Sequence, residues 1–452
     1  MPERATAREA LALVTDDSTF TELPSPPRES TPDGPLEWAG YDASRARAAA
    51  RTGEEESVVC GRATVGGTPA VLIVFEFGFL GGSLGARTGD LLESAYAYAR
   101  EHRLPVVSLV ATGGSRMQEG MLALTQLQRV ARQSALTRAA GLPQLAVLRD
   151  PTTGGGWATL GAGADVVLAL AGAQVGFAGS RVRPPDADPA AYTAEAQLAA
   201  GAVDAVVRPE ELREAVALWL GLLTAPSTEP APVPGALGPT DLPATGWDAV
   251  RGARDPGRPR ARAYLDAYFT RRAAISGDRC GGSDDGMLCG FGTHDGRTVA
   301  YAAQAGTATR PAGYRTATRL IRLAESLSIP VLTLVDTPGA ANDAEAERQG
   351  AGASIAELFT TVATARTPLT TLVIGEGGSG GALALAAPGN TWATPDSYFS
   401  VIAPELAAAI LKRPADQVRP TADQLRVRPQ DLVELGVVRG IVGAAAASPP
   451  RG

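Results

Sequence analysis

The chain has 452 residues, more than one ordinary core holds, and its 45% hydrophobic and 20% charged residues are typical of a soluble globular protein. The 48 acidic residues outnumber the 41 basic ones, and the net charge of -7 argues against a nucleic-acid or membrane-surface protein. Three cysteines without metal-ligand spacing, and no apolar run of about 18 residues, argue against a disulfide framework, a secretion signal or a membrane span and favour a cytoplasmic setting.

The first 57 residues are predicted to form an arm with one helix, over residues 5–14, because five prolines between residues 24 and 35 interrupt any longer element. The glutamate run at residues 54–56 is interpreted as a solvated charge run. Alternating apolar residues over 58–77 predict a strand hairpin that turns at Gly66 and Gly67. A glycine-rich loop then leads into a helix predicted over residues 90–102.

A unit of strand, glycine turn and helix follows twice, with strands predicted over 106–110 and 145–148. Residues 226–246, rich in Pro, Ala and Gly, are predicted to link one domain, 1–225, to a second, 247–452. The second domain repeats this order of strand, glycine turn and helix. We expect helices over 262–274 and 313–326 and strands over 299–304, 331–335 and 369–374. Strands alternating with helices imply parallel sheets, so both halves are predicted to be α/β.

One spacing of 225 residues relates the two halves. It carries Pro105 onto Pro330, Pro143 onto Pro368, Gly114 onto Gly339, and Gly155 with Gly156 onto Gly380 with Gly381. Four landmarks at one spacing predict an internal duplication.

The paired glycine turns favour the binding of an anion. Glycines that open a helix after a buried strand leave backbone N–H groups approachable, with the positive end of the helix dipole behind them. A single such turn is more often a packing device, but two at equivalent positions favour a two-sided site. A phosphate-binding P-loop is excluded, because Lys412 is the only lysine. His102 and His294 are interpreted as surface residues, so the chemistry is expected to rest on backbone donors.

At these residues the chain resembles the carboxyltransferase of biotin-dependent acyl-CoA carboxylases, with a beta-like and an alpha-like half fused in one chain. Similarity to the bacterial acetyl-CoA carboxylase beta subunit lies in residues 75–85, 113–119, 150–155 and 176–182. Similarity to the alpha subunit lies in residues 313–315, 336–339, 375–384 and 398–405.

The resemblance implies two tandem crotonase-like (ClpP/crotonase) domains, the first mainly for acyl-CoA and the second for carboxybiotin. It implies that N–H groups of two glycine pairs hold two oxyanions, while leaving open which pair serves which oxyanion. The predicted catalytic residues are Gly155, Gly156, Gly380 and Gly381. The predicted substrate-binding residues are Gly113, Gly114, Ser115, Arg116, Gly377 and Gly378.

The implied reaction moves a carboxyl group from carboxybiotin to the alpha carbon of acetyl-CoA or propionyl-CoA through an enolate, as in fatty acid biosynthesis. Biotin is expected on a separate protein, because Lys412 lacks the flanking methionines of an attachment site. The implied partners are a biotin carboxylase, a biotin carboxyl carrier protein and further copies of this chain, in a dimer or a dimer-based hexamer.

The chain departs from the family pattern in two places, and its sequence is compatible with several functions. No cysteine precedes Cys60, so we expect no zinc ribbon and no metal. Residues 336–343 replace the loop usual on the biotin side, so the use of biotin is itself a question. Sequence spacing does not separate a carboxyltransferase from a malonyl-CoA or malonyl-ACP decarboxylase, nor does it exclude a non-catalytic subunit. A crotonase-type hydratase is disfavoured, because the glycine turns lack a glutamate pair.

Overall fold

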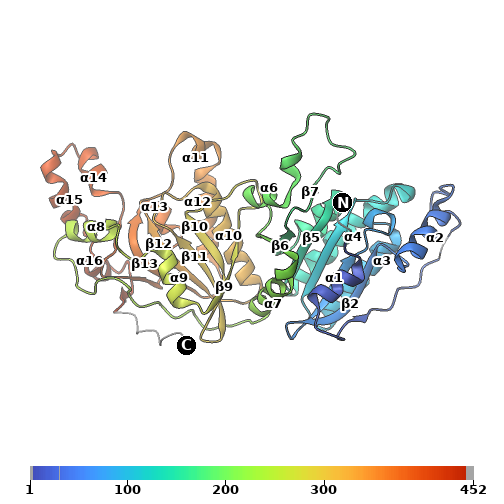
Figure 1. The fold of residues 1–452 in the computed structure, drawn as a ribbon. Coiled ribbons are helices and arrows are strands. Elements are labelled where there is room, and N and C mark those ends of the chain that lie inside the picture. Colours follow the sequence, from blue (N-terminus) through green and yellow to red (C-terminus); the bar gives the residue numbers. More distant parts are fainter. Residues whose placement is uncertain (1–3, 30, 444–452) are drawn as a thin grey trace. The chain divides into compact units, whose positions relative to one another are not determined.

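The computed structural model describes residues 4–29 and 31–443, so the outermost ends of the predicted domains, 1–3 and 444–452, lie outside it. The chain divides into two compact units, Met1–Thr224 with Arg279–Gly281 and Ala225–Asp278 with Gly282–Gly452. Within the described residues, each unit contains one eight-stranded sheet with helices packed against it (Figure 1). Both halves are therefore α/β, as predicted.

The sheet of the first unit has the order β1–β2–β3–β4–β5–β6–β8, with β7 paired to β5. Its strands are β1 Thr21–Glu22, β2 Val58–Val65, β3 Thr68–Phe75, β4 Val106–Thr112, β5 Gln144–Thr153, β6 Val166–Leu170, β7 Val175–Gly176 and β8 Ala205–Val207. The pairs β1–β2 and β2–β3 are antiparallel, which confirms the predicted hairpin, and the remaining pairs are parallel. Buried on both faces, these parallel strands consist of nearly continuous apolar runs.

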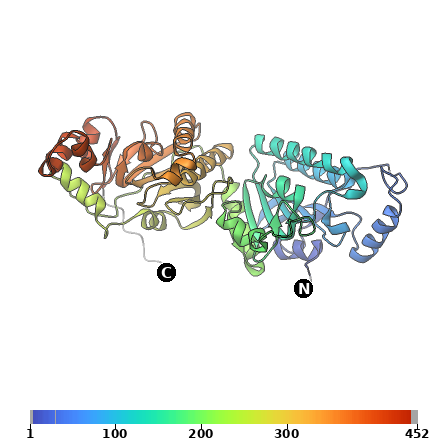
Figure 2. The ribbon, with the colours of Figure 1, turned by 90° about the horizontal axis from the view of Figure 1, so that it is seen from above.

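Helices cover both faces of this sheet. Figure 2 shows the teal helix α4 (Gly120–Ala139) on one side and the blue α1 (Ala7–Val14) with the green α7 (Leu212–Leu223) on the other. Helix α3 (Ala86–Glu101) packs beside α4 and contributes Leu92 and Tyr96 to a core with strand residues. The short helices are α5 Gly154–Gly156 and α6 Ala194–Ala199. Helix α3 begins at Ala86, four residues before its predicted start at residue 90.

The predicted arm contains a second helix that the sequence pattern did not indicate. Helix α1 agrees with the prediction and begins at a capping box in which Thr6 and Glu9 bond each other's backbone N–H. Helix α2 (Tyr41–Thr52) was missed, because only Tyr41 and Ala48 of its residues are buried and no apolar stripe marks it.

The second unit repeats this sheet in the order β16–β14–β13–β12–β11–β10–β9, with β15 paired to β13. Its strands are β9 Arg271–Ile275, β10 Met287–His294, β11 Arg297–Gln304, β12 Val331–Thr337, β13 Leu369–Gly378, β14 Thr391–Ala393, β15 Tyr398–Ser400 and β16 Gly440–Ile441. Its helices are α8 Gly246–Arg254, α9 Ala261–Tyr268, α10 Pro311–Ser326, α11 Ala344–Arg348, α12 Ala351–Thr364, α13 Ser379–Leu383, α14 Pro404–Ile410, α15 Val418–Gln424 and α16 Pro429–Glu434.

One sequence interpretation of the second half needs correction. The helix predicted over 262–274 ends at Tyr268, and the chain continues as β9, which pairs antiparallel with β10. The predicted linker, residues 226–246, contributes Ala231 and Ala236 to the core of the second unit beside Tyr264 and Leu332.

The spacing of 225 residues holds in the structure. It relates β4 to β12, β5 to β13 and α3 to α10 at both ends of each element. The pairing between the two central strands shifts between Val110 and Thr112 in the first sheet and between Val335 and Thr337 in the second. The two sheets therefore repeat each other even in the register shift between their central strands.

Across the described residues, no helix combines the length and the apolar character required to cross a membrane.

Candidate functional site

The first donor turn, Gly154–Gly156, lies directly after β5. Gly154 has the positive φ of 61°, and Gly155 and Gly156 occupy the second and third positions of α5. N–H groups in the first turn of a helix have no acceptor within that helix. The backbone of this turn therefore presents two adjacent donors at the end of a buried strand.

A second glycine turn packs against the first. Gly114 has a φ of 107°, and its N–H donates to Thr112 Oγ1 at 3.0 Å. A Cβ placed on Gly154 would lie 3.1 Å from the Cα of Gly114, so the two backbones touch where side chains do not fit. Thr153 Oγ1 also donates to Thr112 O at 3.1 Å. The structure thus brings the predicted Gly113 and Gly114 onto the predicted catalytic turn.

The second donor turn, Ser379–Gly381, occupies the equivalent place after β13. Gly380 and Gly381 are the second and third residues of α13, and Ser379 takes the place of Gly154 with a φ of 52°. Gly381 O accepts hydrogen bonds from Gln304 Nε2 and Tyr314 OH, each at 3.1 Å. Two side chains thereby hold the carbonyl of Gly381 in place.

The neighbouring residues of the second turn also repeat the first. Gly339 N donates to Thr337 Oγ1 at 3.1 Å, as Gly114 N does to Thr112. Gly377 pairs with Thr337 and Phe399 in the sheet, and Gly378 pairs with Ser400. The predicted Gly377 and Gly378 are therefore the last strand residues before the donors.

The two donor turns differ in the space around them. A Cβ on Gly155 would collide with Leu127, and one on Gly156 with the side chain of Thr112. A Cβ on Gly380 would meet nothing within 4 Å, although one on Gly381 would collide with Ala340 N and Tyr314 OH. Beside Gly380 lies a cavity of about 340 Å³ whose walls include Leu383, Phe399, Val401, Leu425 and Leu435. The second turn therefore opens onto apolar space.

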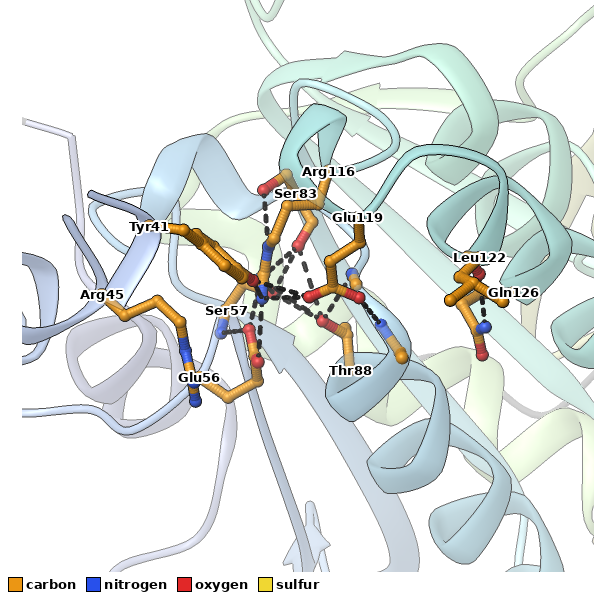
Figure 3. Close-up of polar contacts among 12 residues, drawn as sticks. Tyr41, Arg45, Glu56, Ser57, Ser83, Thr88, Arg116, Glu119, Leu122 and Gln126 are labelled. Carbon is orange, nitrogen blue, oxygen red and sulfur yellow. Dashed lines mark hydrogen bonds and ion pairs between the residues drawn. The ribbon is translucent and has the colours of Figure 1, made fainter. Parts of the chain in front are cut away.

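Arg116, predicted to bind substrate, has its side chain elsewhere. It is 1% exposed and sits in a buried group that we name the Arg116 cluster (Figure 3). The cluster consists of Tyr41, Glu56, Ser57, Ser83, Thr88, Arg116 and Glu119. A guanidinium held this way does not reach a ligand, so the side chain of Arg116 is corrected from a substrate contact to an internal one.

Glu56 is the main partner of Arg116, and its burial overturns the solvated interpretation of the glutamate run at residues 54 and 56, while Glu55 is exposed as interpreted. Both carboxylate oxygens bond the guanidinium, Oε2 to Nη1 at 3.0 Å and Oε1 to Nη2. Glu56 is only 3% exposed, and Glu54 is also buried and pairs with Arg8. Burial acts to raise the pKa of Glu56, but the charge and hydrogen bonds of Arg116 outweigh it and hold that pKa below its ordinary value.

Tyr41 joins the arm to this cluster. Its hydroxyl donates to Glu119 Oε1 at 2.6 Å and accepts from Arg116 Nη1 at 3.2 Å. Burial raises the pKa of Tyr41 to about 12, so the hydroxyl keeps its proton as a donor at neutral pH. Glu119 Oε2 accepts from Ala86 N at 2.6 Å, at the first residue of α3.

The second unit has a buried pair of its own behind its donor turn. Asp336 is 0% exposed and accepts a hydrogen bond from Arg258 Nη2. It also accepts one at 3.2 Å from Glu376 N, on strand β13, which leads into the second donor turn. Arg258 Nη1 also donates to Ile374 O at 3.2 Å. Burial raises the pKa of Asp336 above its ordinary value although Arg258 acts to lower it.

The sequence interpretation missed most of these supporting residues. Glu56 and Arg116 are 60 residues apart in the chain, and Arg258 and Asp336 are 78 apart, so no local pattern links them. A signal did exist in the apolar sequence around Asp336, where a charged residue ends a buried strand.

The two histidines have no contact with the donor turns among the described interactions. His102 follows the last residue of α3, and its ring lies 4.0 Å from that of Tyr98. His294 ends β10 beside the predicted turn, stacks on Tyr268 at 3.7 Å, and its Nδ1 lies 2.7 Å from Tyr268 O. In residues 4–29 and 31–443, no group of three His, Cys, Asp or Glu side chains is arranged to hold a metal ion.

Comparisons with known proteins match both halves. Residues 35–206 match the model of the carboxyl transferase domain, and residues 243–449 match the acetyl co-enzyme A carboxylase carboxyltransferase-like model. The acetyl-coenzyme A carboxylase carboxyl transferase subunits beta/alpha of Salinispora arenicola are 40% identical over 97% of this chain and 82% of that protein.

Solved structures agree in fold. Transcarboxylase 12S, crystallised with methylmalonyl-coenzyme A and methylmalonic acid, has a TM-score of 0.80 at 21% identity, over 99% of this chain and 92% of its own. A single-chain, multi-domain long-chain acyl-CoA carboxylase has a TM-score of 0.75 at 20% identity, over 97% of this chain and 45% of its own. The predicted pair of crotonase-like domains is thereby confirmed. The chain is 40% identical to a fused relative, and each of its halves matches a carboxyltransferase model. It therefore belongs to the family of acetyl-coenzyme A carboxylase carboxyl transferase subunits, with the beta and alpha parts in one chain.

Proposed function

We propose that the chain transfers a carboxyl group from carboxybiotin, carried on a separate protein, to the alpha carbon of acetyl-CoA or propionyl-CoA. The observation that carries this proposal is the pair of donor turns, Gly154–Gly156 and Ser379–Gly381, at equivalent positions in two copies of one sheet. Such a reaction develops negative charge on two oxygens, one on each substrate. A chain with two backbone donor turns supplies one set of donors for each.

We assign Gly155 and Gly156, with the first domain (residues 1–225), to the thioester oxygen of acyl-CoA. We assign Gly380 and Gly381, with the second domain (residues 247–452), to the ureido oxygen of biotin. When bound, carboxybiotin would supply the carboxyl group as carbon dioxide and, through its ureido nitrogen, the base for the alpha proton. The contribution of this chain is to hold both developing anions with donors already in place, and loss of one such donor typically costs about 2.7 to 4 kcal/mol.

The residues around the second turn fit a biotin-like ligand. Apolar walls of the cavity beside Gly380 suit a fused ring system, and the backbone N–H groups of the turn suit its polar ureido end. Both glycines of the first pair are enclosed, Gly155 by Leu127 and Gly156 by Thr112, whereas in the second pair Gly380 is open and only Gly381 is enclosed. A slender thioester carbonyl suits that narrower approach better.

The same proposal includes partners and setting. A biotin carboxylase and a biotin carboxyl carrier protein would load and deliver the carboxyl group in the cytoplasm. Copies of this chain would assemble as a dimer or a dimer-based hexamer, in line with the hexamer assembly described for transcarboxylase 12S. Acyl groups longer than propionyl remain candidates, since one structural neighbour is a long-chain acyl-CoA carboxylase.

The reverse half-reaction tests the proposal without the carrier. Purified protein is incubated with malonyl-CoA or methylmalonyl-CoA, with and without free biotin, while loss of the carboxyl group is followed. We expect turnover that requires biotin. Turnover of equal rate without biotin would support the malonyl thioester decarboxylase, and no turnover with the partners added would support a non-catalytic subunit.

A further inference from the structure

The side chain of Arg116 is too buried to meet a substrate, yet it follows Gly114 by only two residues. All its polar nitrogens have partners: Nε donates to Ser83 Oγ at 3.2 Å, Nη1 to Glu56, and Nη2 to Ser83 O at 2.7 Å. A buried guanidinium with this many fixed partners determines the position of whatever carries them.

Ser83 and Leu84 lie between this guanidinium and the first donor turn. Leu84 N donates to Gly114 O and Arg116 N donates to Leu84 O, both at 2.9 Å. A Cβ on Gly156 would lie 3.6 Å from Leu84 Cδ1, so Leu84 also borders the donor turn through its side chain. Hydrogen bonds therefore connect Arg116 through Ser83 and Leu84 to Gly114, and the side chain of Leu84 reaches the vicinity of Gly156.

Tyr41 adds the arm to this path. Helix α2 buries little else, and its Tyr41 hydroxyl bonds both Glu119 and Arg116. Glu119 in turn holds Ala86 N, three residues after Ser83. The arm is thus fastened to the segment that supports the donor turn.

Stability alone accounts poorly for such an arrangement. Replacing a buried ion pair by apolar groups is often neutral or stabilising, because desolvation of the charges offsets their attraction. A geometric role accounts for it better, since the fork of Arg116 bonds both oxygens of Glu56 while the same guanidinium fixes Ser83.

We propose that Arg116 is a positioning residue for the first donor turn, acting through Ser83 and Leu84, and that Tyr41 couples the N-terminal arm to it. The inference rests on the proposed function in one respect, the assignment of acyl-CoA to this turn. Loss of the Arg116 cluster then weakens the use of acyl-CoA and leaves the biotin side unchanged.

The test compares Arg116→Lys, Glu56→Gln and Tyr41→Phe in the full chain with Arg129→Met. Arg129 joins α3 to α4 through Asp90 and Glu93 in the same unit, is 34% exposed, and touches neither turn. Lysine keeps the charge of Arg116 but lacks the fork that bonds Glu56 and Ser83 together. Displacing a reacting group by 1 Å can lower the rate about 100-fold. We expect a loss of that order in kcat/KM for malonyl-CoA in Arg116→Lys, a smaller one in Tyr41→Phe, and none in Arg129→Met.

Two readouts separate positioning from a merely structural role. KM for free biotin stays at the wild-type value in every variant, and amide hydrogen exchange quickens in residues 81–85 and 113–116 of the cluster variants alone. Equal losses for both substrates, or a lower Tm with wild-type kcat/KM, would overturn the inference. If the wild type transfers no carboxyl group, the proposed function fails, and hydrogen exchange still decides the positioning: unchanged exchange at residues 113–116 in Tyr41→Phe and Glu56→Gln overturns it.

Discussion

The two donor turns share one backbone plan but differ in what holds them. The first is supported by the Arg116 cluster, which includes Tyr41 from the N-terminal arm. The second is supported by Arg258 and Asp336, which bond the donor strand at Ile374 and Glu376. The strand register and the bulges repeat at a spacing of 225 residues, whereas the supporting side chains do not. Duplication thus preserved the donors, while each copy acquired its own means of fixing them.

The two buried ion pairs also differ in electrostatics. Arg116 bonds both oxygens of Glu56. Arg258 bonds only one oxygen of Asp336, and its other nitrogens donate to backbone carbonyls such as those of Ala253 and Ile374. Bidentate pairing is the stronger arrangement. The pKa of Glu56 is accordingly below its ordinary value and that of Asp336 above it.

The largest expected effect comes from blocking the open turn. Gly380→Val should abolish turnover while the fold stays intact, because its side chain would enter the space in front of the donors without striking the protein. Gly352→Val is the matched control, since a Cβ there also meets nothing within 4 Å but lies on α12. Turnover and Tm of both variants are measured. Wild-type turnover in Gly380→Val would contradict the assignment of this turn.

Breaking the pair of the second unit should be the next largest effect. Arg258→Met leaves Asp336 buried without its main partner, and removal of one partner of a buried pair typically costs about 3 to 5 kcal/mol. Thermal and urea unfolding check this expectation. Arg366→Met, which removes an exposed pair with Glu325, serves as the control and should cost about 1 kcal/mol or less. Equal free energies of unfolding for the two variants would contradict the expected difference between a buried and an exposed pair.

The two turns differ in their first residue, which is Ser379 in the second turn and Gly154 in the first. The φ of 52° at Ser379 is a left-handed conformation that its counterpart Gly154 adopts without a side chain. Ser379→Gly should stabilise the protein by about 1 kcal/mol or less, because relief of this strain is partly offset by the flexibility that glycine adds to the unfolded chain. A raised Tm in unfolding experiments is the expected result, and a lowered one would show that the hydroxyl outweighs the strain.

The smallest effect is a difference in pH dependence between the two pairs. The lowered pKa of Glu56 contributes stability that is present above its ordinary value of 4.5 and is lost as the pH falls through the folded pKa. The raised pKa of Asp336 contributes stability that is present below 3.8 and is lost as the pH rises through the folded pKa. The Tm difference between wild type and Glu56→Gln should therefore shrink on acidification, and that for Asp336→Asn should change in the opposite direction. Parallel curves would contradict these shifts.

Much of the fold could be predicted because its signals are local. Buried strands such as β4 and β12 are apolar runs bounded by proline and glycine, and the duplication presents them twice. Helix α2 and strand β9 were missed for a different reason. The first buries too few residues to show a stripe, and the second is defined by pairing with β10 rather than by its own sequence.

The candidate site shows the same limit. The two glycine turns could be predicted because each leaves a glycine-rich string in the sequence, whereas their role as oxyanion donors stays a prediction. Arg116 was placed in the right segment but given the wrong contact, since its partner Glu56 is distant in sequence and was interpreted as solvated. Buried charge pairs depend on tertiary contacts that no spacing along the chain reveals.

The most direct test of the central claim is biotin-dependent loss of the carboxyl group from malonyl-CoA or methylmalonyl-CoA, measured side by side in wild type, Gly380→Val and Gly352→Val. We expect turnover that needs biotin, disappears in Gly380→Val and survives in Gly352→Val. Turnover that is independent of biotin, or that persists in Gly380→Val, would contradict it.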